Sequence, residues 1–285
     1  MFQSNVPAVS PARLPAATRP GDVLTPPSAT EVDQALDAVA ELVDHEPIVL
    51  HYGDADRDDD ERDYFRLHRA RFRETLRRMV RRLPGGARVL DVGSHFLHMA
   101  LALHRLGYTV TAVDVPLYAQ HPRIAARGRP GLTIRAIDAL ASMPLPEAAV
   151  DGIAFLEILE HLAINPKPMW GELGRILKPG GTLFLTTPNF YRLGGGGGGF
   201  LEALRFLRGD GAGVPVQHIL ADQTGGHHWK EYSQRELRRY FDLLGWRITA
   251  ADRFNYLPMK RRWLRIVKRW VPAIWDCHYL ELARG

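Results

Sequence analysis

Short apolar runs alternate with helix-like segments through the middle of this 285-residue chain, and this alternation constrains the fold more than any other feature. Such alternation is typical of a parallel sheet whose strands are joined by crossover helices. After Gly245 the order changes, because two further strand candidates have no ordinary crossover helix between them, which indicates an antiparallel edge pair. We therefore predict an α/β fold with a doubly wound, mostly parallel sheet of seven strands, at residues 88–92, 109–113, 132–136, 152–156, 182–186, 246–252 and 276–283.

The residues before this alternation differ in composition from the rest. Residues 1–30 are rich in proline and poor in large apolar side chains, which predicts a disordered or loosely draped arm. Ser28 or Thr30 can cap a helix from about residue 31 to about residue 45, and a second helix follows from about 60 to about 83. We expect an arm (1–30), an N-terminal helical extension (31–86) and a main domain (87–285) with insertions at 190–226 and 256–275.

Composition and charge exclude several classes of protein. A single cysteine, Cys277, rules out an intramolecular disulfide and a cysteine-based zinc cluster. A net charge of +5 does not indicate a nucleic-acid binder. Because neither a signal peptide nor a membrane-spanning stretch is found, we expect a cytoplasmic protein.

Charge is unevenly distributed before the first strand. An acidic stretch, residues 54–61, precedes an arginine-rich stretch, residues 62–83. This order suits the dipole of one helix, with carboxylates near its start and arginines near its end. A calcium-binding loop is disfavoured, because the acidic stretch lacks the glycine and the distal glutamate that such a loop requires. An anion-binding site formed by the arginines is the other alternative.

The first strand leads into a turn that is typical of nucleotide-binding folds. Gly93 follows the strand Val89-Leu-Asp-Val and permits a sharp turn toward a helix N-terminus. His95 and Leu97 stand where a dinucleotide fingerprint has further glycines, which disfavours a pyrophosphate ligand. Asp114, about 20 residues after the turn, is placed to hydrogen-bond a ribose diol.

Five motifs in this part of the chain resemble those of class I S-adenosylmethionine-dependent methyltransferases. They occur in the family's order from about residue 88 to about residue 252: VLDVGS at 89–94, VTAVDV at 110–115, IDA at 137–139, FLEILEHL at 155–162 and LKPGGT at 177–182. The resemblance implies a Rossmann-like methyltransferase fold with S-adenosylmethionine as cofactor. It also implies cofactor contacts by Asp91, Gly93 and Ser94 at the methionine end, Asp114 at the ribose, Val115, Asp138 and Ala139 at the adenine, and Glu157.

The fourth strand is followed by Glu157, Glu160 and His161, at the edge where open α/β sheets bind ligands. If this segment is helical, the three side chains share one face. The pattern resembles that of ubiquinone-pathway O-methyltransferases and of small-RNA 2′-O-methyltransferases, in which it can hold a divalent metal such as Mg²⁺. Three alternatives stay open: a metal site, a direct catalytic role for His161, and a purely structural role.

Two further segments supply candidate site residues. His228 in Gly-Gly-His-His-Trp-Lys-Glu-Tyr-Ser precedes a helix that Ser233 and Glu236 can cap, and we expect a catalytic base or a fourth metal ligand there. The residues after the fifth strand lead into a glycine tract, which predicts either a mobile lid over the acceptor or an exposed spacer. Candidate acceptor contacts in this segment are Asn189, Tyr191 and Arg192.

The insertion 256–275 combines tryptophans with basic residues. Trp263, Ile266, Val267 and Trp270 fall on one stripe of a helix, and basic residues lie elsewhere around it. This pattern fits an added helix that covers the core, a contact with an anionic membrane surface, or a site for an acidic or phosphorylated substrate.

These features together predict an S-adenosylmethionine-dependent O-methyltransferase. Methyl transfer requires alignment of acceptor and methyl group, and a hydroxyl acceptor also requires a group that removes its proton; His161, His228 and Glu160 are the candidates. We expect a small-molecule or glycan acceptor, namely the hydroxyl of a sugar, a glycolipid or a secondary metabolite. The alternatives are RNA 2′-O-methylation and a nonenzymatic binding protein that retains the fold; the altered turn at His95 and Leu97 motivates the latter.

Overall fold

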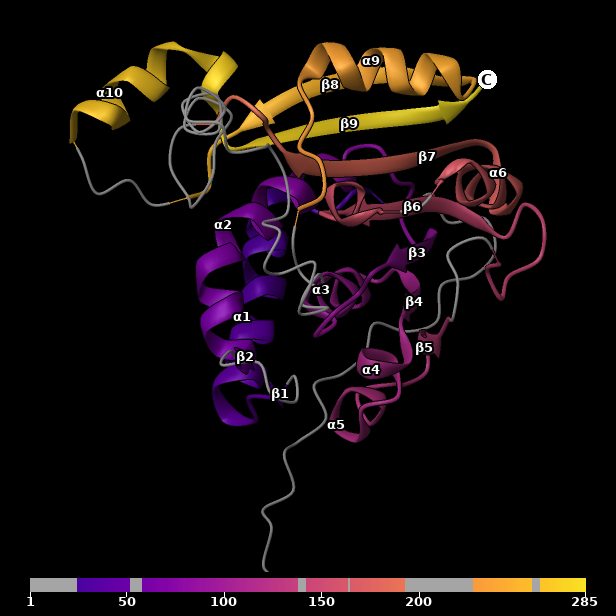
Figure 1. Ribbon diagram of the computed structural model, residues 1–285. Helices are drawn as coiled ribbons and strands as arrows, with labels where there is room; N and C mark the ends of the chain where they lie inside the picture. The colour runs from indigo at the N-terminus through magenta and orange to yellow at the C-terminus, as the bar shows by residue number, and fades with distance from the viewer. Residues whose placement is uncertain (1–24, 52–57, 138–141, 164, 193–227, 258–261) are drawn as a thin grey trace, which may run out of the picture.

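A seven-stranded sheet forms the centre of the molecule in the computed structural model, which describes residues 25–51, 58–137, 142–163, 165–192, 228–257 and 262–285 (Figure 1). The strand order is β5-β4-β3-β6-β7-β9-β8. The first five strands of this order are parallel, and β9 is antiparallel to both β7 and β8. The predicted fold class is confirmed. The strands are β3 (Arg88–Val92), β4 (Thr109–Asp114), β5 (Leu132–Ala136), β6 (Val150–Leu156), β7 (Leu177–Pro188), β8 (Trp246–Phe254) and β9 (Cys277–Arg284).

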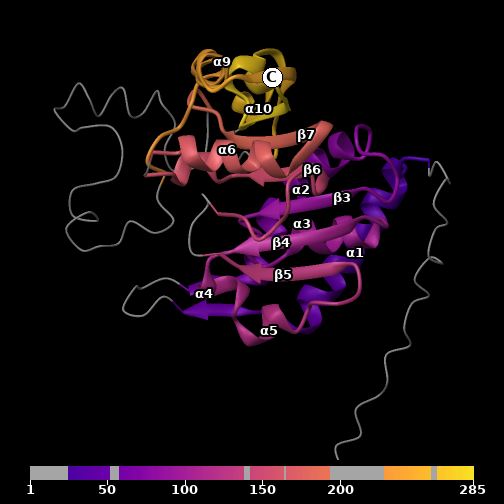
Figure 2. The same ribbon diagram turned by 90° about the vertical axis from the view of Figure 1, so that its right-hand side faces the viewer.

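Helices cover both faces of the sheet, and each face has its own apolar cluster. Val89 of β3 packs in one cluster and the next residue, Leu90, packs in the other, as alternation along a strand requires. The first cluster includes helices α1 (Ala29–His45), α2 (Glu61–Met79) and α3 (His98–Arg105). The second includes α6 (Lys167–Ile176) and α9 (Gln234–Leu243), which pack around the buried Trp170. Figure 2 shows the parallel strands stacked from β7 to β5.

Side-chain caps determine where the two N-terminal helices begin. Ser28 and Glu31 form a capping box at α1, so Ser28 rather than Thr30 is the cap. A small hairpin, β1 (Val49–His51) and β2 (Asp58–Asp60), precedes α2, whose start is capped by the Asp60 side chain. Glu61 and Asp63 lie in the first turn of α2, and Arg77 and Arg78 lie in its last turn, so the predicted order of charges along this helix is confirmed.

The arginines of α2 pair with acidic residues of the neighbouring helix α1. Arg62 and Arg66 contact Asp44 at 3.3 and 3.1 Å, and Arg77 contacts Asp33 at 2.8 Å. These side chains are partly exposed, so each pair contributes little to stability. Together the pairs place the positive charges of α2 opposite the negative charges of α1. Cross-helix pairing accounts for these arginines more directly than the helix dipole does.

The parallel strands end at one common edge, and several short elements gather there. Helices α4 (Pro116–Ala119) and α5 (Pro122–Ala125) follow β4, and the 3₁₀ helix η1 (Leu159–His161) follows β6. Between β8 and β9 lie α10 (Arg262–Trp270) and the 3₁₀ helix η2 (Pro272–Ile274). Most of the predicted lid, residues 193–226, lies outside the described residues. Within the described part of the chain, no helix is long and apolar enough to cross a membrane.

Candidate active site

The turn after β3 has two buried polar groups that face a cleft. Asp91 is 2% exposed, and neither its Oδ2 nor Ser94 Oγ has a hydrogen-bond partner among the described residues. Burial, reinforced by the charge of Asp114, raises the pKa of Asp91 to about 8. Gly93 has a φ of +66°, and a Cβ there would lie 2.7 Å from Ile158 Cδ1. The cleft is lined by Tyr64, Arg71, Phe72, Asp91, Gly93, Ser94, His95, His98, Met99 and Leu156.

His95 and Leu97 both have a left-handed backbone conformation. Their φ angles are 48° and 70°, in the left-handed region that favours glycine. The His95 ring packs against the rings of Tyr64 and Tyr118, with both centroid distances at 4.6 Å. Leu97 is fully buried in the core. Side-chain packing thus holds a turn whose conformation glycine would adopt without strain.

Asp114 lies at the end of β4, beside this turn. Its carboxylate accepts hydrogen bonds from the backbone N–H of His95 at 2.6 Å and of Val115 at 2.7 Å. The side chain is therefore fixed beside the turn, and each oxygen keeps a lone pair for a ligand hydroxyl. Val115 is 47% exposed and offers an apolar surface next to it. Asp138 and Ala139, the predicted adenine contacts, lie outside the described residues.

Helix α2 brings two side chains into the cleft that the sequence did not single out. Arg71 Nη1 lies 3.1 Å from Glu157 Oε2, and Arg71 Nη2 donates to Tyr64 Oη at 3.0 Å. The side chains of Arg71 and Glu157 are 8% and 10% exposed, so this ion pair is largely buried. The sequence signal was weak because neighbouring arginines of α2 have nearly the same spacing, and only the packing of the helix decides which one points inward.

Glu157 does not share a face with Glu160 and His161, contrary to the prediction. Its φ of 57° turns the chain before η1 begins at Leu159, so the segment is not one continuous helix. The Glu157 carboxylate faces Arg71 instead and also accepts from Cys277 Sγ at 3.3 Å. Glu157 therefore does not belong to the group of candidate metal ligands.

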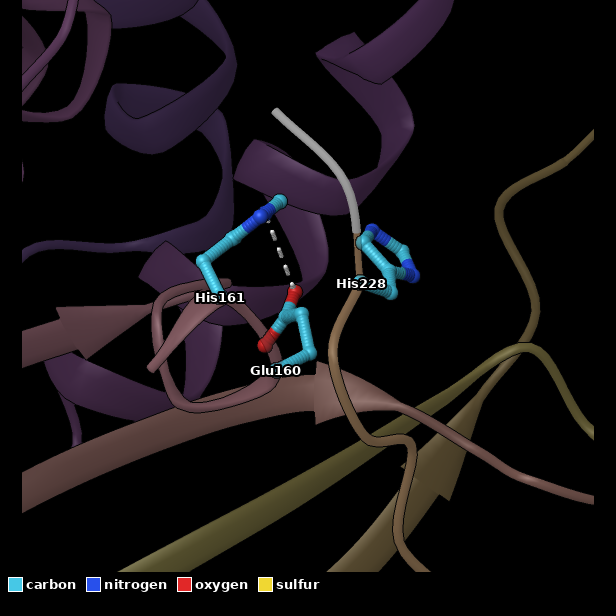
Figure 3. Close-up of side chains that lie close together, drawn as sticks. All are labelled: Glu160, His161 and His228. Atoms are coloured by element: carbon cyan, nitrogen blue, oxygen red, sulfur yellow. Dashed lines mark ion pairs between the residues drawn. The ribbon is translucent and has the colours of Figure 1, made fainter. Parts of the chain in front are cut away.

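Three titratable side chains converge next to this pair. Possible ligand atoms of Glu160, His161 and His228 all lie within 4.8 Å of one another. Figure 3 shows the two imidazoles beside the Glu160 carboxylate, with His161 Nε2 4.0 Å from Glu160 Oε1. The sequence prediction that these three residues meet agrees with this geometry, although His228 lies 67 residues after His161 and 68 after Glu160.

Glu160 is buried, and only one of its oxygens is engaged by a hydrogen bond. It is 1% exposed, and Thr187 Oγ1 donates to Oε2 at 2.9 Å. Oε1 has no hydrogen-bond partner among the described residues. Burial, together with the charge of Glu157, raises the pKa of Glu160 well above its usual range.

His228 is oriented by a carboxylate. Its Nδ1 lies 2.7 Å from Glu231 Oε1, and the other oxygen of Glu231 lies 2.5 Å from Arg192 Nη1. The backbone N–H of Trp229 donates to the Glu160 carbonyl at 2.7 Å, which fixes the segment against η1. The predicted capping box of Ser233 is also present. These contacts leave His228 Nε2 as the ring nitrogen that can face an acceptor.

The predicted acceptor contacts after β7 have different environments. Asn189 is 1% exposed, and its side-chain amide donates to the carbonyls of Ala273 and Trp275 at 2.8 and 2.9 Å. Both amide hydrogens are used, so Asn189 anchors the insertion between β8 and β9 instead of contacting an acceptor. Arg192 is held by Glu231, and Tyr191 is 54% exposed.

Comparison with known proteins assigns the family. A family model described as a methyltransferase domain matches residues 64–251, about two thirds of the chain. The chain belongs to this family. The match begins within α2, so the family model includes the helix that carries Tyr64 and Arg71. The protein is an S-adenosylmethionine-dependent methyltransferase of class I.

Individual relatives and solved structures resemble this methyltransferase over different lengths. The ubiquinone biosynthesis O-methyltransferase of Caulobacter vibrioides is 29% identical over 185 residues, which are 63% of this chain and 67% of that protein. The enzyme of the same name from Xylella fastidiosa strain M23 is 40% identical over 109 residues, but the chain spans only 43% of its length. A chain of the solved complex of the Haloferax volcanii Trm112 methyltransferase activator has a TM-score of 0.52, at 16% identity, over 90% of this chain and 98% of that one. This last likeness shows the fold alone.

The cleft of this methyltransferase fits S-adenosylmethionine. The buried Asp91 Oδ2 and Ser94 Oγ lack partners within the described structure, and both suit the ammonium of the cofactor's methionine end. Asp114 would hold the ribose hydroxyls, and Val115 would pack on the adenine.

Proposed function

We propose that this methyltransferase transfers a methyl group to a hydroxyl oxygen and that His228 removes the hydroxyl proton. The observation that carries the proposal is the convergence of Glu160, His161 and His228 beside the cofactor cleft, with His228 held by Glu231. A hydroxyl is a weak nucleophile until its proton is taken, so an O-directed enzyme gains from a fixed base at this place.

The cofactor, when bound, supplies an electrophilic methyl group on a sulfonium. The residues of the chain act on the acceptor: Glu231 accepts from His228 Nδ1–H, which selects the tautomer with a free lone pair on Nε2. When Nε2 takes the proton, the Glu231 carboxylate stabilises the imidazolium that results. Arg192 holds the second oxygen of Glu231 and keeps the carboxylate in place, which makes Arg192 a positioning residue.

The names of the curated relatives support transfer to oxygen. They are O-methyltransferases of ubiquinone biosynthesis, 29% identical over 185 residues and 40% identical over 109 residues. The finer acceptor class, a hydroxyl of a sugar, a glycolipid or a secondary metabolite, remains our prediction. RNA 2′-O-methylation also remains a prediction from the Glu-x-x-Glu-His pattern.

A second candidate mechanism uses a divalent cation at the same three residues. Glu160, His161 and His228 provide one oxygen and two nitrogen ligands, and Glu231 would orient the His228 ring as carboxylates commonly do for metal-bound histidines. Oε1 of the buried Glu160, which accepts no hydrogen bond from the described residues, is the atom that fits such an ion. A cation there would lower the pKa of the acceptor hydroxyl and orient it.

Methyl transfer from radiolabelled S-adenosylmethionine to a panel of phenols, sugars, glycolipids and RNA tests the proposal. We expect transfer to a hydroxyl compound, a loss of about 100-fold or more in kcat for His228→Ala and a smaller loss for Glu231→Gln, because general bases contribute 10²–10⁴-fold. The exposed His45 in the last turn of α1 provides a matched control, since His45→Ala removes an imidazole that does not line the cleft.

Calorimetry and chelation separate the alternatives. The variants should bind the cofactor like the unmodified protein, because His228 and Glu231 do not line the cofactor turn. Full activity in excess EDTA would support proton removal by His228 without a metal. Loss of activity in EDTA and its recovery with Mg²⁺ would support the mechanism that uses a divalent cation. Unchanged kcat in His228→Ala would contradict both mechanisms, and absence of cofactor binding by the unmodified protein would favour the nonenzymatic alternative.

A further inference from the structure

Helix α10 carries an apolar face that is turned to solvent. Ile266 is 58% exposed and Trp270 is 76% exposed, and Val267 and Val271 on the same side are 36% and 40% exposed. A helix that covers a core turns such residues inward. This arrangement argues against the core-covering helix that the sequence also allowed.

The orientation of α10 is fixed by a buried ion pair. Lys268 is 3% exposed and pairs with Asp276, which is 1% exposed. The second oxygen of Asp276 accepts the backbone N–H groups of Tyr256 and Leu257, both at 3.0 Å. Trp275 Nε1 donates to the Lys268 carbonyl at 2.6 Å. The polar Lys268 therefore holds the helix to the protein and leaves the apolar residues facing outward.

Positive charge accompanies the exposed apolar face. Residues 260–270 contain six lysines and arginines and no acidic residue. In the sequence, Arg262, Arg265 and Arg269 recur at spacings of three and four residues, which is the helical pattern of a basic flank. The described side chain of Arg269 is exposed, and its guanidinium lies 6.0 Å from the ring of Trp270 in the apolar stripe. An apolar stripe next to a basic flank is the pattern of a helix that lies in a membrane interface.

The helix is anchored at the same edge of the sheet as the candidate active site. Asn189, directly after β7, holds the carbonyls of Ala273 and Trp275 that follow the helix. On the other side of the insertion, the ring of Tyr256 lies 5.5 Å from the Arg71 guanidinium of the cofactor cleft. Figure 1 shows α10 standing out beyond the ends of β8 and β9.

We propose that α10 docks this methyltransferase onto the surface of an anionic phospholipid bilayer. Ile266, Val267, Trp270 and Val271 enter the boundary between headgroups and acyl chains, and the basic flank faces the lipid phosphates. A bilayer matches both features, because it offers negative charge beside an apolar layer. The inference depends on the exposed helix alone and stands apart from the proposed proton transfer.

Flotation of the full-length protein with vesicles tests this docking. Vesicles of phosphatidylcholine with about a third phosphatidylglycerol are compared with pure phosphatidylcholine, at low and high salt. We expect binding to the anionic vesicles that weakens strongly in high salt, because the attraction is screened. The double variant Ile266→Ser, Trp270→Ser should partition at least about tenfold less, since it removes most of the inserted apolar area.

The control is Leu243→Ser on α9, where a leucine that is 74% exposed lies outside α10. It should bind vesicles like the unmodified protein, and all variants should bind the cofactor equally. The proposal is overturned if the unmodified protein ignores anionic vesicles at low salt, or if the double variant binds them as well. It is also overturned if sedimentation shows a dimer that the double variant dissociates while vesicle binding is unaffected, because α10 would then join two copies.

Discussion

At the scale of single residues, the ionisation of Asp91 makes cofactor affinity depend on pH. Its pKa of about 8 means that the buried carboxyl is largely protonated in the free protein at neutral pH. The sulfonium and ammonium of the cofactor favour the ionised carboxylate, so binding must release this proton below pH 8. Each released proton changes the affinity by up to about tenfold per pH unit.

We therefore expect cofactor affinity to rise between pH 6.5 and about 8 and to level off above that. Calorimetry in two buffers with different heats of ionisation should detect close to one proton released per cofactor at pH 7. Asp91→Asn should bind more weakly at pH 8.5 and lose the dependence. A flat affinity profile for the unmodified protein would show that Asp91 is already ionised before binding.

At the scale of elements, a buried ionic cluster joins α2 to the main domain. Glu61 is fully buried, accepts the backbone N–H of Ile48 at 2.9 Å and contacts His98 Nε2 at 3.2 Å. Arg127 binds both oxygens of this carboxylate: Nη2 donates to Oε2 at 3.0 Å, and Nη1 lies 2.5 Å from Oε1. Burial opposes ionisation of Glu61, but the hydrogen bonds from His98 and Arg127 outweigh it and lower the pKa of Glu61. Removing the charge would leave Arg127 buried without a counter-ion.

Glu61→Gln should lower the free energy of unfolding by about 3 kcal/mol or more, the scale measured when one partner of a buried ion pair is removed. Glu74→Gln on the same helix is the control, since its pair with Arg78 is partly exposed and should contribute less than about 1 kcal/mol. Urea denaturation measures both. Equal effects of the two substitutions would mean that the Glu61 cluster adds no stability beyond that of a surface pair.

The elements differ in how well sequence predicted them. The strands of the main sheet were located to within two residues at each end, except that β7 begins at Leu177 and not at residue 182. Their apolar runs are bounded by glycine, proline and charged residues, whereas the short hairpin of β1 and β2 was not predicted. The segment after β6 was predicted as one helical face, but the left-handed φ of Glu157 and its pairing with Arg71 depend on a helix more than 80 residues earlier. The orientation of α10 also had to come from the structure, because Lys268 is one of several equivalent basic residues until Asp276 selects it.

At the scale of the whole molecule, the N-terminal helices share a core with the sheet. Leu36 of α1 is fully buried in the cluster that contains Val89 of β3, and Leu237 of α9 is fully buried in the cluster on the opposite face. The two clusters are separated only by the sheet, and the Arg71–Glu157 pair connects α2 with the end of β6. Because both clusters pack against the same strands, unfolding of one cluster would expose the sheet and destabilise the other cluster.

We expect the molecule to unfold in a single transition that reports on both clusters. Leu36→Ala and Leu237→Ala should each lower its free energy of unfolding by about 2–5 kcal/mol, the range for leucine truncation in a core. Far-ultraviolet circular dichroism and tryptophan fluorescence, recorded during urea denaturation, should give coincident curves for both variants. Cofactor should shift both curves to higher urea, because it binds only the folded cleft. An early separate transition in Leu36→Ala alone would show that the helical extension folds independently of the sheet.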